Sequence, residues 1–317
     1  MGNKIPVGIS ACLMGEKVRF DGGHRRFAFA MDELAPYVRF APICPEMAIG
    51  LPTPRPALRL VRDEQGRIAM RTGKNQNDDD LTQPMQSFSE QQVQTLGDLC
   101  GYIVCAKSPS CGMERVRVYD RAGARKNGVG LYTGELMRQL PWLPVEEDGR
   151  LHDAQLRENF VARVYTLYEF NQLLQQPLTR GGLMAFHSRY KLLLLAHSQP
   201  QYRQIGPFVA AMDRFATLES FALEYRNRLM ALLSNNATRP NHTNVLMHAQ
   251  GYFHRYLTQK QRQELTSLID SYRQGMQPLL APITLLKHYM AEYPDAWLAQ
   301  QRYFEPYPEA LRLRYGH

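Results

Sequence analysis

The chain contains 317 residues, of which 44% are hydrophobic and 21% charged, and its formal net charge is +8. This composition supports a well-buried core and about two domains, which excludes a disordered chain, and the arginines are spread too evenly for a dedicated nucleic-acid-binding protein. Because the sequence has neither an apolar run of membrane-spanning length nor a signal peptide at its start, we expect a cytoplasmic protein without a membrane partner.

The first 150 residues alternate short apolar segments with polar or helical ones. In chain order, the predicted elements are a strand at 5–10, a helix near 27–37, a strand at 38–43, a helix near 89–101, strands at 102–107 and 115–120, a helix at 130–142 and a short closing segment at 143–151. This alternation is typical of an α/β domain with a Rossmann-like, mostly parallel sheet. The polar stretch 72–86 is interpreted as a loop that covers the site.

The sequence pattern changes after about residue 150 to long segments whose apolar residues recur every three or four positions, as in amphipathic helices. We therefore predict three parts: an α/β domain over residues 1–150, a connecting helix or linker over 151–178, and an all-α domain over 179–317.

Three of the five cysteines, Cys12, Cys44 and Cys111, each follow a predicted strand. The carboxyl ends of parallel strands meet at one edge of the sheet, so these thiols can lie together. A disulfide framework is not expected in a reducing compartment from an odd number of cysteines. Cys100 and Cys105 flank or lie within a strand and are expected to be buried as small apolar side chains.

Iron–sulfur clusters and zinc both select thiolates, although structural zinc usually takes four ligands, often in closely spaced pairs that this chain lacks. A cluster held by three thiolates leaves one iron open to act as a Lewis acid. The spacing of the cysteines alone leaves three readings open, namely a cluster, zinc or a coincidence of loop cysteines.

Three motifs around these cysteines resemble the signature loops of the thiouracil desulfidase (TudS) family. They are SACLMGEKVRFDGG at 10–23, CPEMAIGLPTPR at 44–55 and KSPSCG at 107–112. The later segments MAFHSRYKLLLLAHS, NVLMHAQGYFHRYL and PITLLKHYMAEY resemble the helical domain, of unknown function, found in YbgA-like proteins.

The resemblance implies an oxygen-sensitive [4Fe-4S] cluster bound by Cys12, Cys44 and Cys111, with one open iron. It implies an enzyme that converts 2- or 4-thiouracil, or a related thiolated pyrimidine, to uracil with release of hydrosulfide. Glu46 and Ser108 match the family's acidic and serine catalytic residues. Iron–sulfur assembly machinery is the implied protein partner.

Roles for Glu46 and Ser108 can also be proposed from the chemistry of their side chains alone. A carboxylate beside the cluster can take a proton from water that attacks a thiocarbonyl and later return it. Glu46 could instead cap the turn that begins at Pro45. Ser108 could orient water or the pyrimidine, or it could be a turn residue before Pro109, and Ser110 is its local competitor.

Three further residues are weaker candidates for substrate binding. Ser10 can support Cys12 and hydrogen-bond to cluster sulfurs. Asp21 lies in an Asp-Gly-Gly turn followed by His24, Arg25 and Arg26, which could face a phosphate or base or could be a solvated turn. Arg55 is close in sequence to Cys44, with a surface position as the alternative.

Two other functions remain open from the sequence. One is sulfur transfer on thiolated nucleosides or tRNA, although the ATP-binding loop that usually accompanies such chemistry is absent from the sequence. The other is a non-catalytic protein that binds zinc or senses oxidation through its thiols. The sequence also leaves open whether a desulfidase substrate would be a free base, a nucleoside or RNA.

Overall fold

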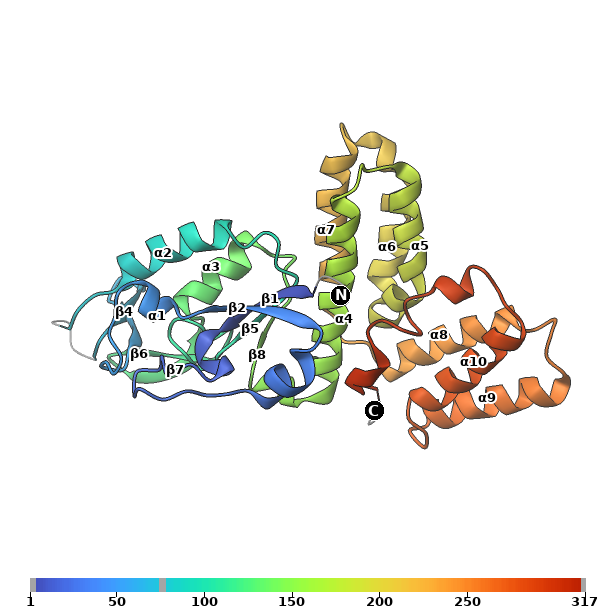
Figure 1. The fold of residues 1–317 in the computed structure, drawn as a ribbon, viewed down its shortest axis with the longest axis horizontal. Coiled ribbons are helices and arrows are strands. Elements are labelled where there is room, and N and C mark those ends of the chain that lie inside the picture. Colours follow the sequence, from blue (N-terminus) through green and yellow to red (C-terminus); the bar gives the residue numbers. More distant parts are fainter. Residues whose placement is uncertain (1–3, 74–77, 315–317) are drawn as a thin grey trace. The chain divides into compact units, whose positions relative to one another are not determined.

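The computed structural model describes residues 4–73 and 78–314 and divides into two compact units, Met1–His152 and Asp153–His317 (Figure 1). The first unit is α/β and the second is helical, which confirms the predicted fold class. Helix α4, Ala154–Leu174, lies inside the second unit, whereas the sequence suggested a connector there.

A four-stranded parallel sheet forms the centre of the first unit, in the order β2-β1-β5-β8. Its strands are β1 (Ile5–Ser10), β2 (Val38–Ile43), β5 (Tyr102–Val104) and β8 (Val145–Glu147). Strands β1 and β5 are almost wholly buried, as expected of a parallel sheet covered on both faces. Helices α2 (Thr82–Gln94) and α3 (Leu131–Gln139) pack against each other on one side (Figure 1).

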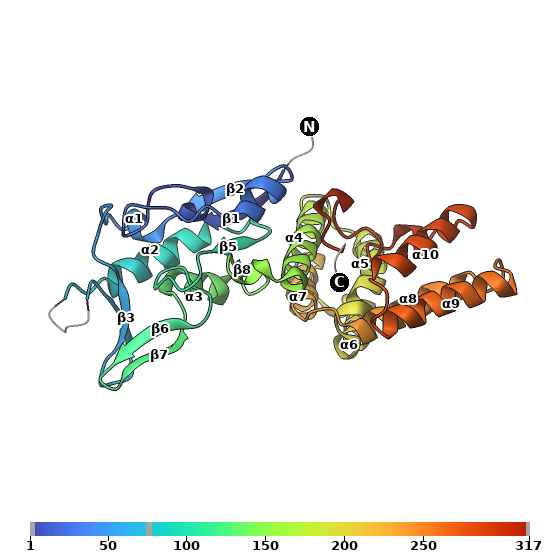
Figure 2. The same ribbon diagram turned by 90° about the horizontal axis from the view of Figure 1, so that it is seen from below.

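A second sheet, in the order β4-β3-β6-β7, combines two antiparallel hairpins through a parallel β3–β6 pair (Figure 2). The strands are β3 (Arg59–Arg62), β4 (Ile68–Arg71), β6 (Val116–Asp120) and β7 (Gly123–Gly128). The sequence predicted β6 alone. Strands β3 and β4 have only four residues each, and β7 is polar and exposed over most of its length.

Two local predictions in this unit are corrected. The helix expected near 27–37 is a π-helix, η2, over Phe29–Leu34. The loop expected over 72–86 ends early, because α2 begins at Thr82, whose backbone N–H and hydroxyl both donate to the Asp80 carboxylate. Residues 74–77 of that stretch lie outside the described residues.

The second unit is built from α4 and six further α-helices. These are α5 (Arg180–His197), α6 (Gln199–Ala210), α7 (Leu218–Leu233), α8 (Arg239–Tyr252), α9 (Gln259–Arg273) and α10 (Leu280–Glu292). All but α10 begin with an Asp, Ser or Thr side chain that accepts a hydrogen bond from the first turn, which satisfies N–H groups that have no partner inside the helix. Within the described residues, no helix combines the length and apolar character needed to cross a bilayer.

Candidate active site

The cysteines meet where the order of the parallel sheet changes direction. From β1 the chain continues to β2 on one side, and later returns to β5 on the other, so loops diverge at the carboxyl ends of these strands. Cys12 follows β1 in a 3-10 turn, η1 (Ala11–Met14), and Cys44 follows β2 as the N-cap of α1 (Pro45–Ala48). Cys105 and Cys111 follow β5.

Gly15 and Pro45 shape the turns that carry Cys12 and Cys44. Gly15 ends η1 with φ +100°, a left-handed conformation that glycine adopts without strain, and its N–H donates back to the turn. Pro45 occupies the first position of α1, where its fixed φ suits a helix start and its missing N–H costs no bond. Each turn therefore fixes the backbone beside a thiol.

The loop that carries Cys111 is bound to the start of α3. The Tyr132 N–H donates to the carbonyl of Ser110 at 3.0 Å, and the Thr133 hydroxyl donates to that of Cys111 at 2.6 Å. Gly130 makes this approach possible, because a Cβ there would lie 2.5 Å from the Ser110 backbone. The Cys111 thiol is therefore held on a rigid support.

All four of these cysteines line one cavity of about 380 Å³. Cys12, Cys105 and Cys111 are buried, and Cys44 is half-buried. Cys12 and Cys105 hydrogen-bond to each other, and Ser10 hydrogen-bonds to the Cys111 thiol. The Ser10 hydroxyl also accepts from the Cys105 N–H at 3.0 Å, so it joins the loops after β1 and β5.

The hydrogen bond between Cys105 and Cys12 is the main cause that lowers the pKa of Cys105, whereas burial favours the uncharged form of Cys44 and Cys111. Burial raises the pKa of Cys111 to about 12 and also raises the pKa of Cys44. The pKa of Cys12 is raised mainly by its hydrogen bond to Cys105, and further by burial and the nearby thiols. Such groups become thiolates when a metal centre supplies positive charge, so metal binding here would release protons.

The donor set is compatible with an iron–sulfur cluster, because thiolates are the ligands that such clusters select. Among residues 4–73 and 78–314, no three histidine, cysteine or carboxylate side chains converge on a point where one metal ion could bind them. A multi-iron cluster does not require this, because each iron takes its own thiolate. Thiols from three strand ends, spread around one cavity, can hold such a group.

Glu46 lies in the same cavity, in a buried ion pair with Arg55. The Arg55 Nε donates to Glu46 Oε2 at 2.8 Å and its Nη2 donates to the same oxygen at 2.5 Å. Arg55 also donates to the carbonyls of Pro52 and Val18 at 3.1 and 2.9 Å. Its side chain is only 3% exposed, so the surface position considered for Arg55 is wrong.

A hydroxyl chain runs from Ser108 to Glu46. Ser110 Oγ donates to Glu46 Oε1 at 2.7 Å, so its oxygen is left to accept from Ser108 Oγ, which lies 2.9 Å away. Ser108 Oγ in turn accepts from the N–H groups of Ser110 and Cys111 at 3.3 and 3.1 Å. Both serines thus take part, one as a loop support and the other as the contact with the carboxylate.

The structure brings together every predicted site residue except Asp21. The Asp21 carboxylate accepts from the Gly23 N–H at 3.0 Å and pairs with Arg19 at 3.6 Å, and it lies outside the cavity lining among the described residues. Its hydrogen bond to the Gly23 N–H is the main cause that lowers its pKa. The structure therefore agrees with the alternative in which Asp21 belongs to a solvated turn.

Several residues that line the cavity were not proposed from the sequence as site residues, among them Cys105 and Arg19. Cys105 is buried, as expected, but also faces the other thiols. Arg19 and Arg25 line the cavity, and Arg25 pairs with the buried Asp148 at 2.9 Å. Arg19 lies inside the motif at 10–23, and Arg25 follows the Asp-Gly-Gly turn that the sequence already offered as a loop facing a phosphate or base. Nothing in the sequence distinguishes Cys105 from a core residue.

Comparison with known proteins assigns both parts of the chain. The 2-thiouracil desulfurase family model matches residues 7–148, and a family described as a protein of unknown function, DUF1722, matches residues 191–308. The solved structure of TudS, a [4Fe-4S]-dependent thiouracil desulfidase, is 28% identical with a TM-score of 0.37, and the match covers 48% of this chain and 94% of that one.

The uncharacterised protein YbgA of Escherichia coli (strain K12) is 52% identical over 159 residues. This match covers 50% of the present chain and 94% of YbgA. Both families match the resemblance that the sequence motifs suggested. Residues 7–148 match the family model described as 2-thiouracil desulfurase, and the chain belongs to the YbgA family.

Proposed function

We propose that the α/β unit is a non-redox desulfidase that replaces the C=S group of a thiolated pyrimidine, such as 2- or 4-thiouracil, with C=O. Water supplies the oxygen, and the sulfur leaves as hydrosulfide, so no electron donor or acceptor is needed. The family match over residues 7–148 supports the reaction type. The thiol-lined cavity supports a [4Fe-4S] cofactor held by Cys12, Cys44 and Cys111.

When bound, such a cluster would supply an open iron that accepts the substrate's sulfur and draws electron density from the thiocarbonyl carbon. Glu46 takes the proton from the attacking water and returns it as sulfur leaves. Arg55 holds the carboxylate in place through Oε2, which leaves Oε1 directed at Ser110. Ser108 and Ser110 provide a hydroxyl path along which a proton can reach that oxygen.

The observation that carries the proposal is the hydrogen bond from Ser110 to Glu46. Ser110 directly precedes the proposed ligand Cys111, and Glu46 lies two residues after the proposed ligand Cys44. The hydrogen bond therefore joins the two ligand loops inside one buried cavity. A purely structural zinc site does not require a buried carboxylate, other than its own ligands, that is bonded to both ligand loops.

Oxygen tracing tests the reaction. The protein, reconstituted anaerobically with iron and sulfide, is incubated with 4-thiouracil in ¹⁸O-labelled water. We expect one labelled oxygen in each uracil and one hydrosulfide per uracil formed. Uracil without label, or sulfur that appears in a second organic product, would contradict hydrolytic desulfuration and favour sulfur transfer.

A specific surface favours a substrate larger than a free base. A groove of about 670 Å³ shares Ala57, Leu58, Lys107 and Pro109 with the thiol cavity. Its described lining has five cationic side chains and no carboxylate; these are Arg59, Lys107, Arg115, Arg117 and Lys126. Such a groove suits phosphates next to the pyrimidine. A thiolated nucleotide or RNA is therefore our second candidate substrate.

A further inference from the structure

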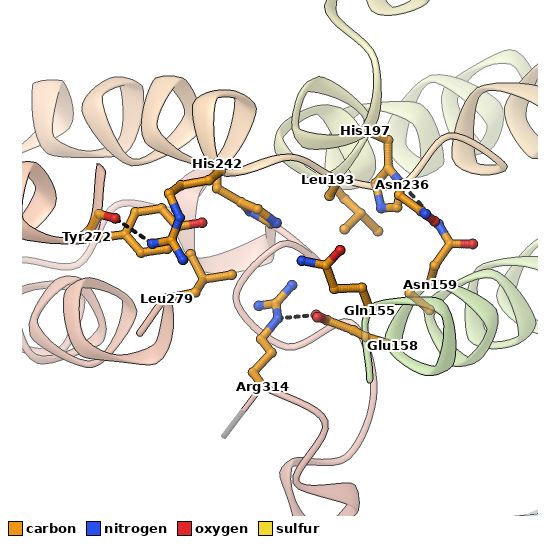
Figure 3. A pocket seen from close by; sticks show the side chains of 13 residues that line it. Gln155, Glu158, Asn159, Leu193, His197, Asn236, His242, Tyr272, Leu279 and Arg314 are labelled. Atoms are coloured by element: carbon orange, nitrogen blue, oxygen red, sulfur yellow. Dashed lines mark hydrogen bonds and ion pairs between the residues drawn. The ribbon is translucent and has the colours of Figure 1, made fainter. Parts of the chain in front are cut away.

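The helical unit contains a separate cavity of about 220 Å³ (Figure 3). Its walls come from the first turns of α4, the end of α5, the start of α8, and the segments that carry Leu279 and Arg314. The volume is about seven times the roughly 30 Å³ that one water occupies in the liquid, and it is below the roughly 300–1,000 Å³ of pockets for drug-sized ligands. Only a small molecule fits.

A buried arginine lines this cavity. Arg314 is 7% exposed; its Nε donates to Glu158 Oε1 at 2.6 Å and its Nη1 to the Tyr303 carbonyl at 2.7 Å. Its guanidinium also hydrogen-bonds to the Tyr307 side chain. A guanidinium at a cavity wall can donate to a carboxylate or phosphate from outside the chain.

Two buried histidines also line the cavity. His197 and His242 are 6% and 7% exposed and use Nδ1 internally, with the Asn235 carbonyl at 2.6 Å and the Tyr303 hydroxyl at 2.9 Å. Of the residues the structure describes, none bonds to either Nε2. Burial lowers the pKa of His197 to about 4 and that of His242 below its ordinary value, so both rings are neutral.

The charges at the cavity do not balance. Glu158 is the one carboxylate in the described lining, and its Oε1 already accepts from Arg314 and from the Tyr307 hydroxyl. The Arg239 guanidinium lies 4.7 Å from the centre of the Tyr272 ring and donates to the Tyr272 carbonyl, with no acidic partner among the described residues. Two arginines against one glutamate leave a charge of +1.

Helix α8 strengthens this positive field. It begins at Arg239 and is 14 residues long, so the partial positive charge of its N-terminus faces the same space. We infer that the cavity binds a small anion whose carboxylate or phosphate group accepts from the guanidinium groups of Arg239 and Arg314. This ligand site is distinct from the thiol cavity and goes beyond the proposed desulfidase.

Thermal unfolding of the full chain tests the site, with inorganic phosphate and malonate as probes and sodium chloride at equal ionic strength as the reference. We expect phosphate or malonate to raise the unfolding temperature by a few degrees along a saturating curve, and the stronger probe identifies the anionic group. The variant Arg239→Gln should lose the rise, while Arg255→Gln, an exposed arginine outside the cavity, should keep it.

A second measurement uses the wild-type chain, so it does not depend on whether a variant folds. In the wild-type chain labelled with ¹⁵N-histidine, the imidazole resonances of His197 and His242 should shift along the same saturation curve, while that of the exposed His254 should not. No saturable rise with either probe, or an equal rise in Arg239→Gln, overturns the proposal. Shifts at all histidines alike would mean unspecific salt binding and would overturn it too.

Discussion

Arg55 and Glu46 form a buried ion pair in which the guanidinium Nε lies 2.8 Å from the carboxylate Oε2. The two side chains are 3% and 11% exposed. Arg55 therefore holds the proposed base from one side while Ser110 binds its other oxygen. The position of Glu46 depends on two neighbours from different loops.

Removing Arg55 should cost both stability and activity. The variant Arg55→Ala leaves the Glu46 carboxylate buried without its cation, which costs about 3–5 kcal/mol for a pair broken on one side. Urea unfolding measures the loss. The matched control Arg26→Ala breaks an exposed pair with Asp32, whose side chains are 46% and 56% exposed, and should cost under about 1 kcal/mol. Equal losses would mean that the buried pair has no special role.

Ser110→Ala should slow the reaction without loss of the cluster. The change removes the hydroxyl between Ser108 and Glu46, and general acid–base steps contribute roughly 10²–10⁴-fold, so we expect kcat to fall within that range. Iron content and KM should stay near those of the wild type. Ser89→Ala, which removes a buried hydroxyl bonded to the Met85 carbonyl, is the control and should leave kcat unchanged. Full activity in Ser110→Ala would remove the hydroxyl path from the mechanism.

Iron analysis of single cysteine variants tests the ligand set. Alanine at Cys12, Cys44 or Cys111 should prevent stable cluster binding, because each supplies one iron with its thiolate. Cys100→Ala should keep the cluster, since Cys100 lies outside the cavity lining. Cys105→Ala should keep it as well. A wild-type iron content in Cys44→Ala, or loss of iron in Cys105→Ala, would mean that a different set of thiols binds the cluster.

Reversing the charge of the basic groove should separate the two candidate substrates. Arg117 and Lys126 are exposed, so Arg117→Glu and Lys126→Glu should fold normally. We expect weaker binding of 4-thiouridine-containing tRNA and a salt slope smaller by about 1 for each lost phosphate contact. Rates on 4-thiouracil should not change. Arg121→Glu, on the same hairpin but outside the groove, is the control, and an equal effect there would argue against a defined phosphate path.

The helical unit should lose stability in mild acid. Burial lowers the pKa of His187 and His197 to about 4, so the unfolded state takes up protons first. Their contribution is complete above about pH 6.5 and is lost as the pH falls towards 4, by roughly 2 kcal/mol for each histidine at pH 5.

Urea unfolding at pH 7.5 and pH 5 measures this loss in Trp142→Phe, where Trp297 of the helical unit is the remaining tryptophan. His187→Gln should weaken the pH dependence. The exposed His254 serves as the control, because His254→Gln should leave the dependence as it is. Identical stability at both pH values would contradict neutral buried imidazoles.

The positions of Cys12, Cys44 and Cys111 could be predicted because a parallel sheet collects the residues that follow its strands. The burial of Arg55 could not, since an arginine in a proline-rich loop is usually exposed and only its carbonyl and carboxylate partners reveal the site. Cys105 shows the same limit, because a thiol directly after a buried strand resembles any small core residue.

Most of the second sheet, apart from β6, also escaped prediction for a physical reason. Strands such as Arg59–Arg62 and Ile68–Arg71 have four residues each and are stabilised by pairing with distant segments. Short strands of this kind carry too few alternating positions for a periodic signal. The basic groove beside the thiol cavity is partly built from this sheet, so it could not be predicted from the sequence either.

The central claim is that the thiol cavity holds an iron–sulfur cluster that removes sulfur from thiolated pyrimidines. The most direct measurement is anaerobic reconstitution, followed by iron and sulfide analysis and an assay of the same sample on 2- and 4-thiouracil. We predict about four irons and four sulfides per chain, with uracil and hydrosulfide formed in equal amounts. One zinc without sulfide, or a fully loaded protein that leaves both thiouracils and thiolated RNA unchanged, would contradict the account.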